Sequence, residues 1–109
     1  MITSELSGYA LNYAVAMCEQ RRDDPDRLLP LEWHLADFCN DWAQGGEIIE
    51  RENIELVPKL EHWDAYYAEL IVPYEGKTAL IAAMRCYVAS VLGDEVNIPD
   101  EIIEAEQWS

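Results

Sequence analysis

The chain of 109 residues has the length of one domain, and half of its residues are apolar, which is enough for a single core. Its 22 acidic and 7 basic residues give a net charge of −15, which argues against binding to nucleic acid or to an anionic membrane surface. No apolar run approaches the ~20 residues of a membrane span, and Met1–Glu5 does not resemble a signal peptide. We therefore expect one cytoplasmic domain, residues 1–109.

The first predicted element is an amphipathic helix over 7–20. Ser7 is its expected N-cap, and Thr3 is the alternative if the helix starts earlier. Pro25 cannot continue a helix, so residues 21–27 are predicted to form a polar linker. Apolar residues recur at three- and four-residue steps, as one helix face requires: Leu6, Ala10, Tyr13, Ala14, Met17 and Cys18.

The segment from residue 28 to residue 40 gives a mixed signal. It is dense in apolar residues, but Pro30 interrupts them. A short helix over 31–39 and a strand both remain open. The pattern here does not decide between the two periods.

A turn is predicted at Gly45 and Gly46, because paired glycines supply backbone angles that other residues avoid. In this interpretation Trp42 anchors the turn in the core. Residues 47–52 have no clean period and fit either one helical turn or an irregular crossing.

Two strands are expected next, over 54–57 and 63–72. Both are rich in β-branched or aromatic residues, which suit a pleated surface. The residues between them, 58–62, suit a hairpin loop. Residues 73–76 read as a turn.

The strongest predicted element is a helix over 78–92, with Thr78 as its N-cap and Gly93 after its last turn. Together these elements predict an α+β fold in which two helices pack on a small antiparallel sheet. Beyond the helix, residues 94–109 form an acidic C-terminal extension, because no basic residue follows Arg85.

The residues that could carry chemistry are sparse. Cys18, Cys39 and Cys86 are odd in number and far apart, which predicts three reduced thiols. His34 and His62 do not complete a metal-ligand spacing with them. A Cys–His pair for nucleophilic catalysis also has no support in the spacing. We therefore predict no catalytic residue, no metal site and no cofactor.

Three blocks of the sequence stand out: Thr3–Leu6 with Ala10–Ala16, Asp41–Gly46 with Ile48–Glu52, and Thr78–Ser90 with Leu92–Val96. In this order they resemble the phage NinX-like family. The resemblance implies a small accessory protein of tailed bacteriophages or prophages that works in the bacterial cytoplasm. Since the function of this family is unknown, no catalytic residue carries over. Residues 21–38 depart from the family pattern.

The second block supplies one set of candidate functional residues: Asp41, Trp42, Gln44, Gly45, Gly46, Glu50 and Arg51. The acidic extension supplies the partner-binding candidates: Asp94, Glu95, Asp100, Glu101, Glu104 and Trp108. A strongly negative surface steers basic partners, and tryptophan is common at interface hot spots. The first hypothesis is therefore a non-enzymatic binder of a host protein with a basic surface. Such a protein could imitate nucleic acid and inhibit a nuclease, a polymerase or a defence complex.

Two alternatives come from other classes of function. A small enzyme would have its site around Trp42–Arg51, where Gln44, Glu50 and Arg51 would converge with a histidine or a cysteine. A self-associating module would use exposed aromatic residues as a homodimer patch. The aromatic residues outside the predicted helices are Trp33, Trp42, Trp63, Tyr66, Tyr67, Tyr74 and Trp108.

Overall fold

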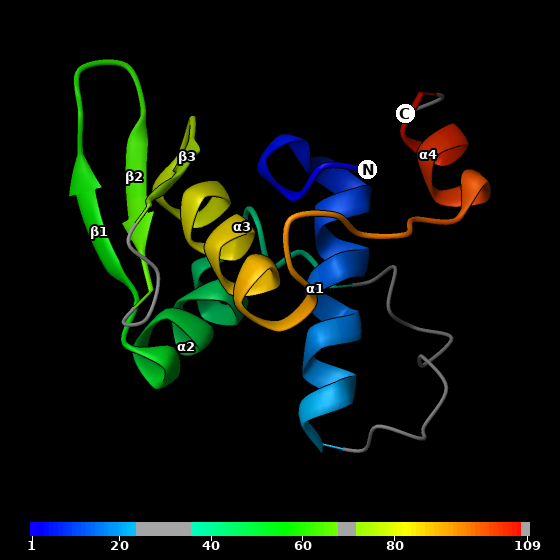
Figure 1. The fold of residues 1–109 in the computed structure, drawn as a ribbon, viewed down its shortest axis with the longest axis horizontal. Helices are drawn as coiled ribbons and strands as arrows, with labels where there is room; N and C mark the ends of the chain where they lie inside the picture. The colour runs from blue at the N-terminus through cyan, green and yellow to red at the C-terminus, as the bar shows by residue number, and fades with distance from the viewer. Residues whose placement is uncertain (24–35, 68–71, 108–109) are drawn as a thin grey trace.

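A computed structural model of the chain describes residues 1–23, 36–67 and 72–107. Its elements confirm the α+β class (Figure 1). In chain order they are η1 (Thr3–Glu5), α1 (Gly8–Asp23), α2 (Trp42–Glu52), β1 (Glu55–Pro58), β2 (Trp63–Tyr66), β3 (Tyr74–Gly76), α3 (Ala79–Leu92) and α4 (Asp100–Gln107).

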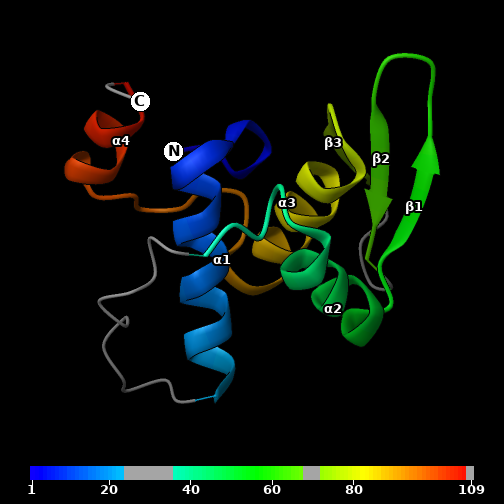
Figure 2. The same ribbon diagram turned by 180° about the vertical axis from the view of Figure 1, so that it is seen from behind.

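The elements lie in layers along the longest axis of the molecule. The strands form one antiparallel sheet in the order β1-β2-β3. Helix α3 packs against all three strands, α1 packs on α3, and α4 packs on α1. The two opposite views agree that α4 lies at the far end of the molecule from the sheet (Figures 1 and 2). The core sits mainly between α1, α3 and the sheet.

Helix α3 confirms the strongest prediction from the sequence. The Thr78 hydroxyl accepts a hydrogen bond from the backbone N–H of Ile81 at 3.1 Å, as an N-cap does. Gly93 ends the helix with φ 88°, a region that glycine enters without strain. The side chains of Leu80, Met84 and other residues on this helix are buried, so α3 is the centre of the core.

Helix α1 is longer than predicted, because it continues to Asp23. Residues 21–23 are therefore helical, which corrects the start of the predicted linker. Arg21 and Arg22 favour this extension, since a positive charge near a helix C-terminus interacts favourably with the negative end of the helix dipole. The rest of that linker, 24–27, and most of the mixed segment, 28–35, lie outside the described residues.

Thr3 does not cap α1. It belongs to η1 and is fully buried, and its hydroxyl donates a hydrogen bond to the carbonyl oxygen of Gly93 at 2.6 Å. Its backbone N–H donates to the carbonyl of Asp94 at 2.8 Å. The start of the chain is thus fastened to the segment that follows α3.

The first hairpin follows the prediction closely. Strand β1 pairs with β2, and the backbone N–H of Lys59 donates to the carbonyl of His62 at 2.9 Å to close the loop. Pro58 is tolerated as the last residue of β1, because β1 is an edge strand. Strand β2 ends at Tyr66, and residues 68–71 of the predicted second strand lie outside the described part of the chain.

The predicted turn at 73–76 is wrong, because this segment forms β3. Glu75 lies opposite Asp64 in the register of β2 and β3. A side chain at Gly76 would collide with the backbone of Ala82 in α3, so only glycine lets the strand lie this close. The guanidinium of Arg85 donates to the Glu75 carbonyl at 2.7 Å and fixes β3 to α3.

The predicted turn at Gly45 and Gly46 is also wrong, because both glycines lie inside α2. A Cβ at Gly45 would meet the carbonyl oxygen of Phe38 and, at 2.6 Å, the Leu80 side chain. Close packing against α3 thus explains a glycine in this helix better than a turn does. Trp42 does not anchor the segment either, because 57% of it is exposed.

Candidate functional site

The first half of the motif segment Asp41–Arg51 serves to position α2. Asp41 caps the helix, accepting from the N–H of Ala43 at 2.9 Å and from the Gln44 amide at 3.0 Å. The Gln44 side-chain oxygen accepts from the N–H of Asp37 at 2.9 Å. The Asp37 carboxylate accepts from the Asn12 amide of α1 at 3.1 Å. These polar groups satisfy one another and join α1 to the start of α2.

Asn12 is the buried centre of this junction, with 4% of its surface exposed. Its side-chain oxygen also accepts from the backbone N–H of Cys39 at 3.1 Å. A buried amide whose donor and acceptor are both used stabilises a fixed arrangement of the chain. Asn12 is not among the residues predicted from the sequence, because a single polar residue within a helical apolar pattern gives no signal of its partner.

Arg51 is the centre of a second polar network at the other end of α2. Its guanidinium forms a two-pronged ion pair with Glu19 of α1, at 2.7 and 3.2 Å. Its Nε donates to Glu52 at 2.9 Å, and it also donates to the Tyr87 hydroxyl of α3 at 3.1 Å. Tyr67 donates to the other oxygen of Glu52. One side chain therefore joins α1, α2 and α3.

The pKa shifts follow from these contacts. Burial opposes the charge on Arg51, but its hydrogen bonds to Glu19 and Glu52 raise its pKa above the usual range. The hydrogen bonds from Arg51 and Tyr67 lower the pKa of Glu52. Burial raises the pKa of the Tyr87 phenol, which therefore stays protonated. Arg51 is thus a permanent charge whose neighbours neutralise it.

In the described part of the chain, the side chains that the enzyme hypothesis requires do not converge. Gln44 and Arg51 are about two turns apart on α2, or roughly 10 Å along its axis. Glu50 is exposed. Cys39 is buried beside α1, and His62 lies before β2 in the hairpin loop. His34 lies outside the described residues.

The three cysteines, all in the described part of the chain, are buried thiols that form no disulfide. Burial raises the pKa of the Cys18 thiol to about 12, with a smaller effect from Glu19. Burial also raises the pKa of Cys86 to about 11. Since the thiolate is the reactive form, Cys18 and Cys86 are poor nucleophiles at neutral pH.

The acidic segment after α3 is attached to the fold over residues 94–104. Val96 and Ile98 are each only 5% exposed, and Ile102 and Ile103 pack against the core. The amino group of Met1 donates to the Val96 carbonyl at 2.7 Å. Helix α4 then lies against α1 (Figure 1).

The predicted partner-binding carboxylates lie on the outside of this attached segment. The side chains of Asp94, Glu95, Asp100, Glu101 and Glu104 are exposed. The Tyr74 hydroxyl donates to Asp94 at 2.9 Å, and burial together with this carboxylate raises the pKa of Tyr74 to about 12. The phenol thus remains a donor at neutral pH. The remaining candidate, Trp108, lies outside the described residues.

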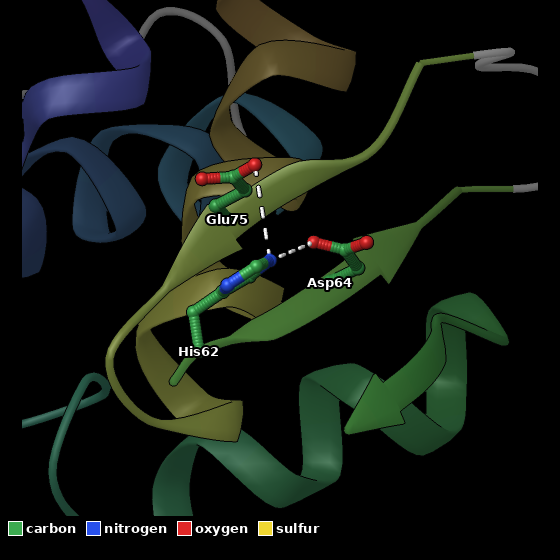
Figure 3. A group of neighbouring side chains, drawn as sticks. All are labelled: His62, Asp64 and Glu75. Carbon is green, nitrogen blue, oxygen red and sulfur yellow. Dashed lines mark hydrogen bonds and ion pairs between the residues drawn. The ribbon is translucent and has the colours of Figure 1, made fainter. Parts of the chain in front are cut away.

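A group of three side chains that local sequence patterns do not predict lies on the sheet. The Nε2 atom of His62 is 2.9 Å from Oδ1 of Asp64 and 3.8 Å from Oε1 of Glu75 (Figure 3). Asp64 is buried, whereas Glu75 is largely exposed. The signal that could have revealed the group is the pairing of β2 with β3, which places Asp64 opposite Glu75.

In the described part of the chain, every helix is too short or too polar to cross a membrane. The family model described as Bacteriophage P22, NinX matches residues 2–91. No curated protein matches the chain. The matched range includes Asp41–Arg51 and the group on the sheet, and it ends before α4.

Proposed function

We propose a function from the premise that this chain belongs to the bacteriophage P22 NinX family and is a phage accessory protein. In this proposal it acts without catalysis, by binding a bacterial host protein that has a basic surface. The binding takes place in the host cytoplasm. The partner is a protein that handles nucleic acid, such as a nuclease, a polymerase or a defence complex.

The observation that carries the proposal is the attachment of the acidic segment to the fold. Buried Val96 and Ile98 fix the segment, and Ile102 and Ile103 of α4 pack against the core. The carboxylates of Asp100, Glu101 and Glu104, at the start of α4, are therefore presented from a positioned helix. A surface that is already ordered before binding loses less conformational entropy when a partner docks.

The charge balance of the rest of the chain supports the same function. Of the 7 basic residues, Arg51 is paired with Glu19 and Glu52, and Arg85 donates to the backbone carbonyls of Leu6 and Glu75. The 22 acidic residues thus far outnumber the positive charges, and Arg51 is already paired with two of them. A field of this sign accelerates encounter with basic surfaces and repels nucleic acid.

The test compares capture of host proteins by three forms of the full chain. One is the natural chain, and the second carries Asp100→Lys, Glu101→Lys and Glu104→Lys in α4. The third reverses three exposed acids elsewhere, Glu47, Glu55 and Glu61, and so has the same net charge. Captured proteins are identified by mass spectrometry after washes at low and high salt, and circular dichroism confirms that each form is folded.

The expected result is a basic host protein that binds to the natural chain and to the third form, but not to the form with lysines in α4. High salt should release this protein. Duplex DNA should compete for the same partner if the carboxylates imitate phosphates. Equal loss in both charge-reversed forms would show that net charge alone attracts proteins, and the proposed surface on α4 would be wrong. Equal retention in all three forms would also overturn it.

Self-association is the second candidate function. The exposed aromatic side chain of Trp42 is the observation that favours it. Sedimentation velocity at two protein concentrations separates this from binding to a host partner. A homodimer that Trp42→Ala dissociates would favour the self-associating module. A monomer at both concentrations removes this alternative.

A further inference from the structure

The side chains of His62, Asp64 and Glu75 form a group to which the proposed function assigns no role. We propose that these three side chains bind one divalent transition-metal cation of the zinc class. The inference does not depend on the proposed function, since the group lies on the sheet and the acidic surface lies on α4.

The sheet brings the three side chains to one face. Ala65 faces α3, since it is part of the buried core. A side chain at Gly76 would point to the same face, because it would collide with Ala82 of α3. Because side chains alternate along a strand, Asp64 and Glu75 point to the opposite face. They are cross-strand partners in the register of β2 and β3. His62 lies two positions before Asp64 and points towards both carboxylates (Figure 3).

The distances suit a common ion. The donor atoms of the three side chains all lie within 4.8 Å of one another, and the two distances from the imidazole nitrogen are 2.9 and 3.8 Å. With metal–ligand bonds of about 2.1 Å, neighbouring donors of an octahedral or tetrahedral ion are about 3.0–3.4 Å apart. The observed distances lie on either side of this range. The exposed Glu75 side chain is the one free to close the longer gap.

The electrostatics of the group also favour a cation. Two carboxylates face one imidazole, so the group is negative whether or not the ring is protonated. Asp64 is only 6% exposed, and a buried carboxylate in a negative group gains from a positive ion beside it. The backbone bond from Lys59 to the His62 carbonyl holds the histidine in the closed hairpin loop.

The donor set selects the class of cation. One imidazole nitrogen with two carboxylate oxygens suits Zn²⁺ and its first-row neighbours, whereas Mg²⁺ and Ca²⁺ prefer oxygen ligands alone. For binding, Nε2 must present its lone pair, so the ring proton must be on Nδ1. Three protein ligands leave the remaining coordination positions to water.

The test titrates Zn²⁺ into the EDTA-treated full chain by calorimetry, in parallel with Mg²⁺. The chain has two histidines, which gives a matched pair of variants, His62→Gln and His34→Gln. Asp64→Asn removes a second ligand, and Glu61→Gln changes a neighbouring exposed acid that is not part of the group. Circular dichroism confirms that each variant is folded.

The expected result is one saturable Zn²⁺ site per chain that Mg²⁺ does not fill. Because loss of an outer-shell partner alone costs about 10–100-fold in affinity, His62→Gln and Asp64→Asn should each weaken binding by more than about tenfold. His34→Gln and Glu61→Gln should leave the affinity unchanged. A second readout, amide NMR shifts on adding Zn²⁺, should be concentrated in β2 and β3.

Several outcomes would overturn the proposal. One is the absence of saturable binding. Another is binding that His34→Gln or Glu61→Gln weakens as much as His62→Gln does, because the zinc would then be held elsewhere. If Asp64→Asn fails to fold, His62→Gln still decides the question, since His62 is half-exposed and its replacement leaves no cavity in the core.

Discussion

Adjacent glycines in α2 differ in what surrounds them, although the sequence alone does not distinguish them. Gly45 is buried against the loop at Phe38 and against Leu80 of α3. Among the described residues, only the Trp42 ring lies near Gly46, and a Cβ there would be at an ordinary distance of 3.5 Å from it. At the first position glycine permits close packing, and at the second it only weakens the helix.

This contrast predicts opposite effects of the same substitution. Gly46→Ala should raise the free energy of unfolding by about 0.5–1 kcal/mol, because alanine is the better helix former. Gly45→Ala should lower it by about 1–3 kcal/mol, because the added methyl group forces the backbone or Leu80 to move. Urea denaturation of both variants measures the two values. Equal effects at the two positions would contradict the packing seen around α2.

At the scale of the elements, α1, α2 and α3 meet at one ion-pair network. Arg51 contacts Glu19 and Tyr87, and it contacts Glu52, which in turn accepts from Tyr67. The residues come from distant parts of the chain. The contribution of this network depends on the charge of Glu52, whose pKa lies below its ordinary value of 4.5.

A pH dependence follows from this lowered pKa. A carboxyl group with a lowered pKa in the folded state stabilises the fold above its unfolded pKa, and the contribution is lost as the pH falls through the folded pKa. Glu52→Gln should therefore cost about 1 kcal/mol near pH 7 and progressively less below about pH 4. Urea denaturation at several pH values measures the difference. Glu50→Gln, an exposed neighbour with the same charge change, should have little effect at any pH.

For the whole molecule, the net charge of −15 is the dominant property. The acids that no cation offsets repel one another across a small surface, which disfavours the compact state. Ion pairs such as Arg51–Glu19 act in the opposite direction, but the 22 acidic residues far outnumber the 7 basic residues that could offset them. Salt screens both the repulsion between acids and the attraction within ion pairs. The direction in which added salt changes the stability therefore shows which of the two is larger.

We expect the repulsion to be larger. Thermal unfolding in NaCl should show a melting temperature that rises between about 0.02 and 0.5 M salt, because the Debye length falls below the spacing of most surface charges. The form with lysines at 100, 101 and 104 should show a smaller rise, since its net charge is less negative. A melting temperature that falls with salt would mean that the ion pairs outweigh the repulsion.

Much of the fold is readable from local patterns. The helix over 78–92 and its Thr78 cap are encoded within one segment, because apolar periodicity and a capping side chain are local properties. The hairpin of β1 and β2 is likewise fixed by neighbouring residues around a short loop. The block around Asp41–Arg51 is confirmed as part of the matched family range, but its structural role is not visible in the residues themselves.

The sequence by itself determined the α+β class, the excess of negative charge and the family. These depend on composition, on local periodicity and on residue identity. Only the tertiary structure decided that Gly45 lies in a helix, that 74–76 forms a strand and that His62 meets Asp64 and Glu75. In each of these, the deciding contact joins distant residues or neighbouring strands. Close packing and strand register arise from such contacts, which no local pattern specifies.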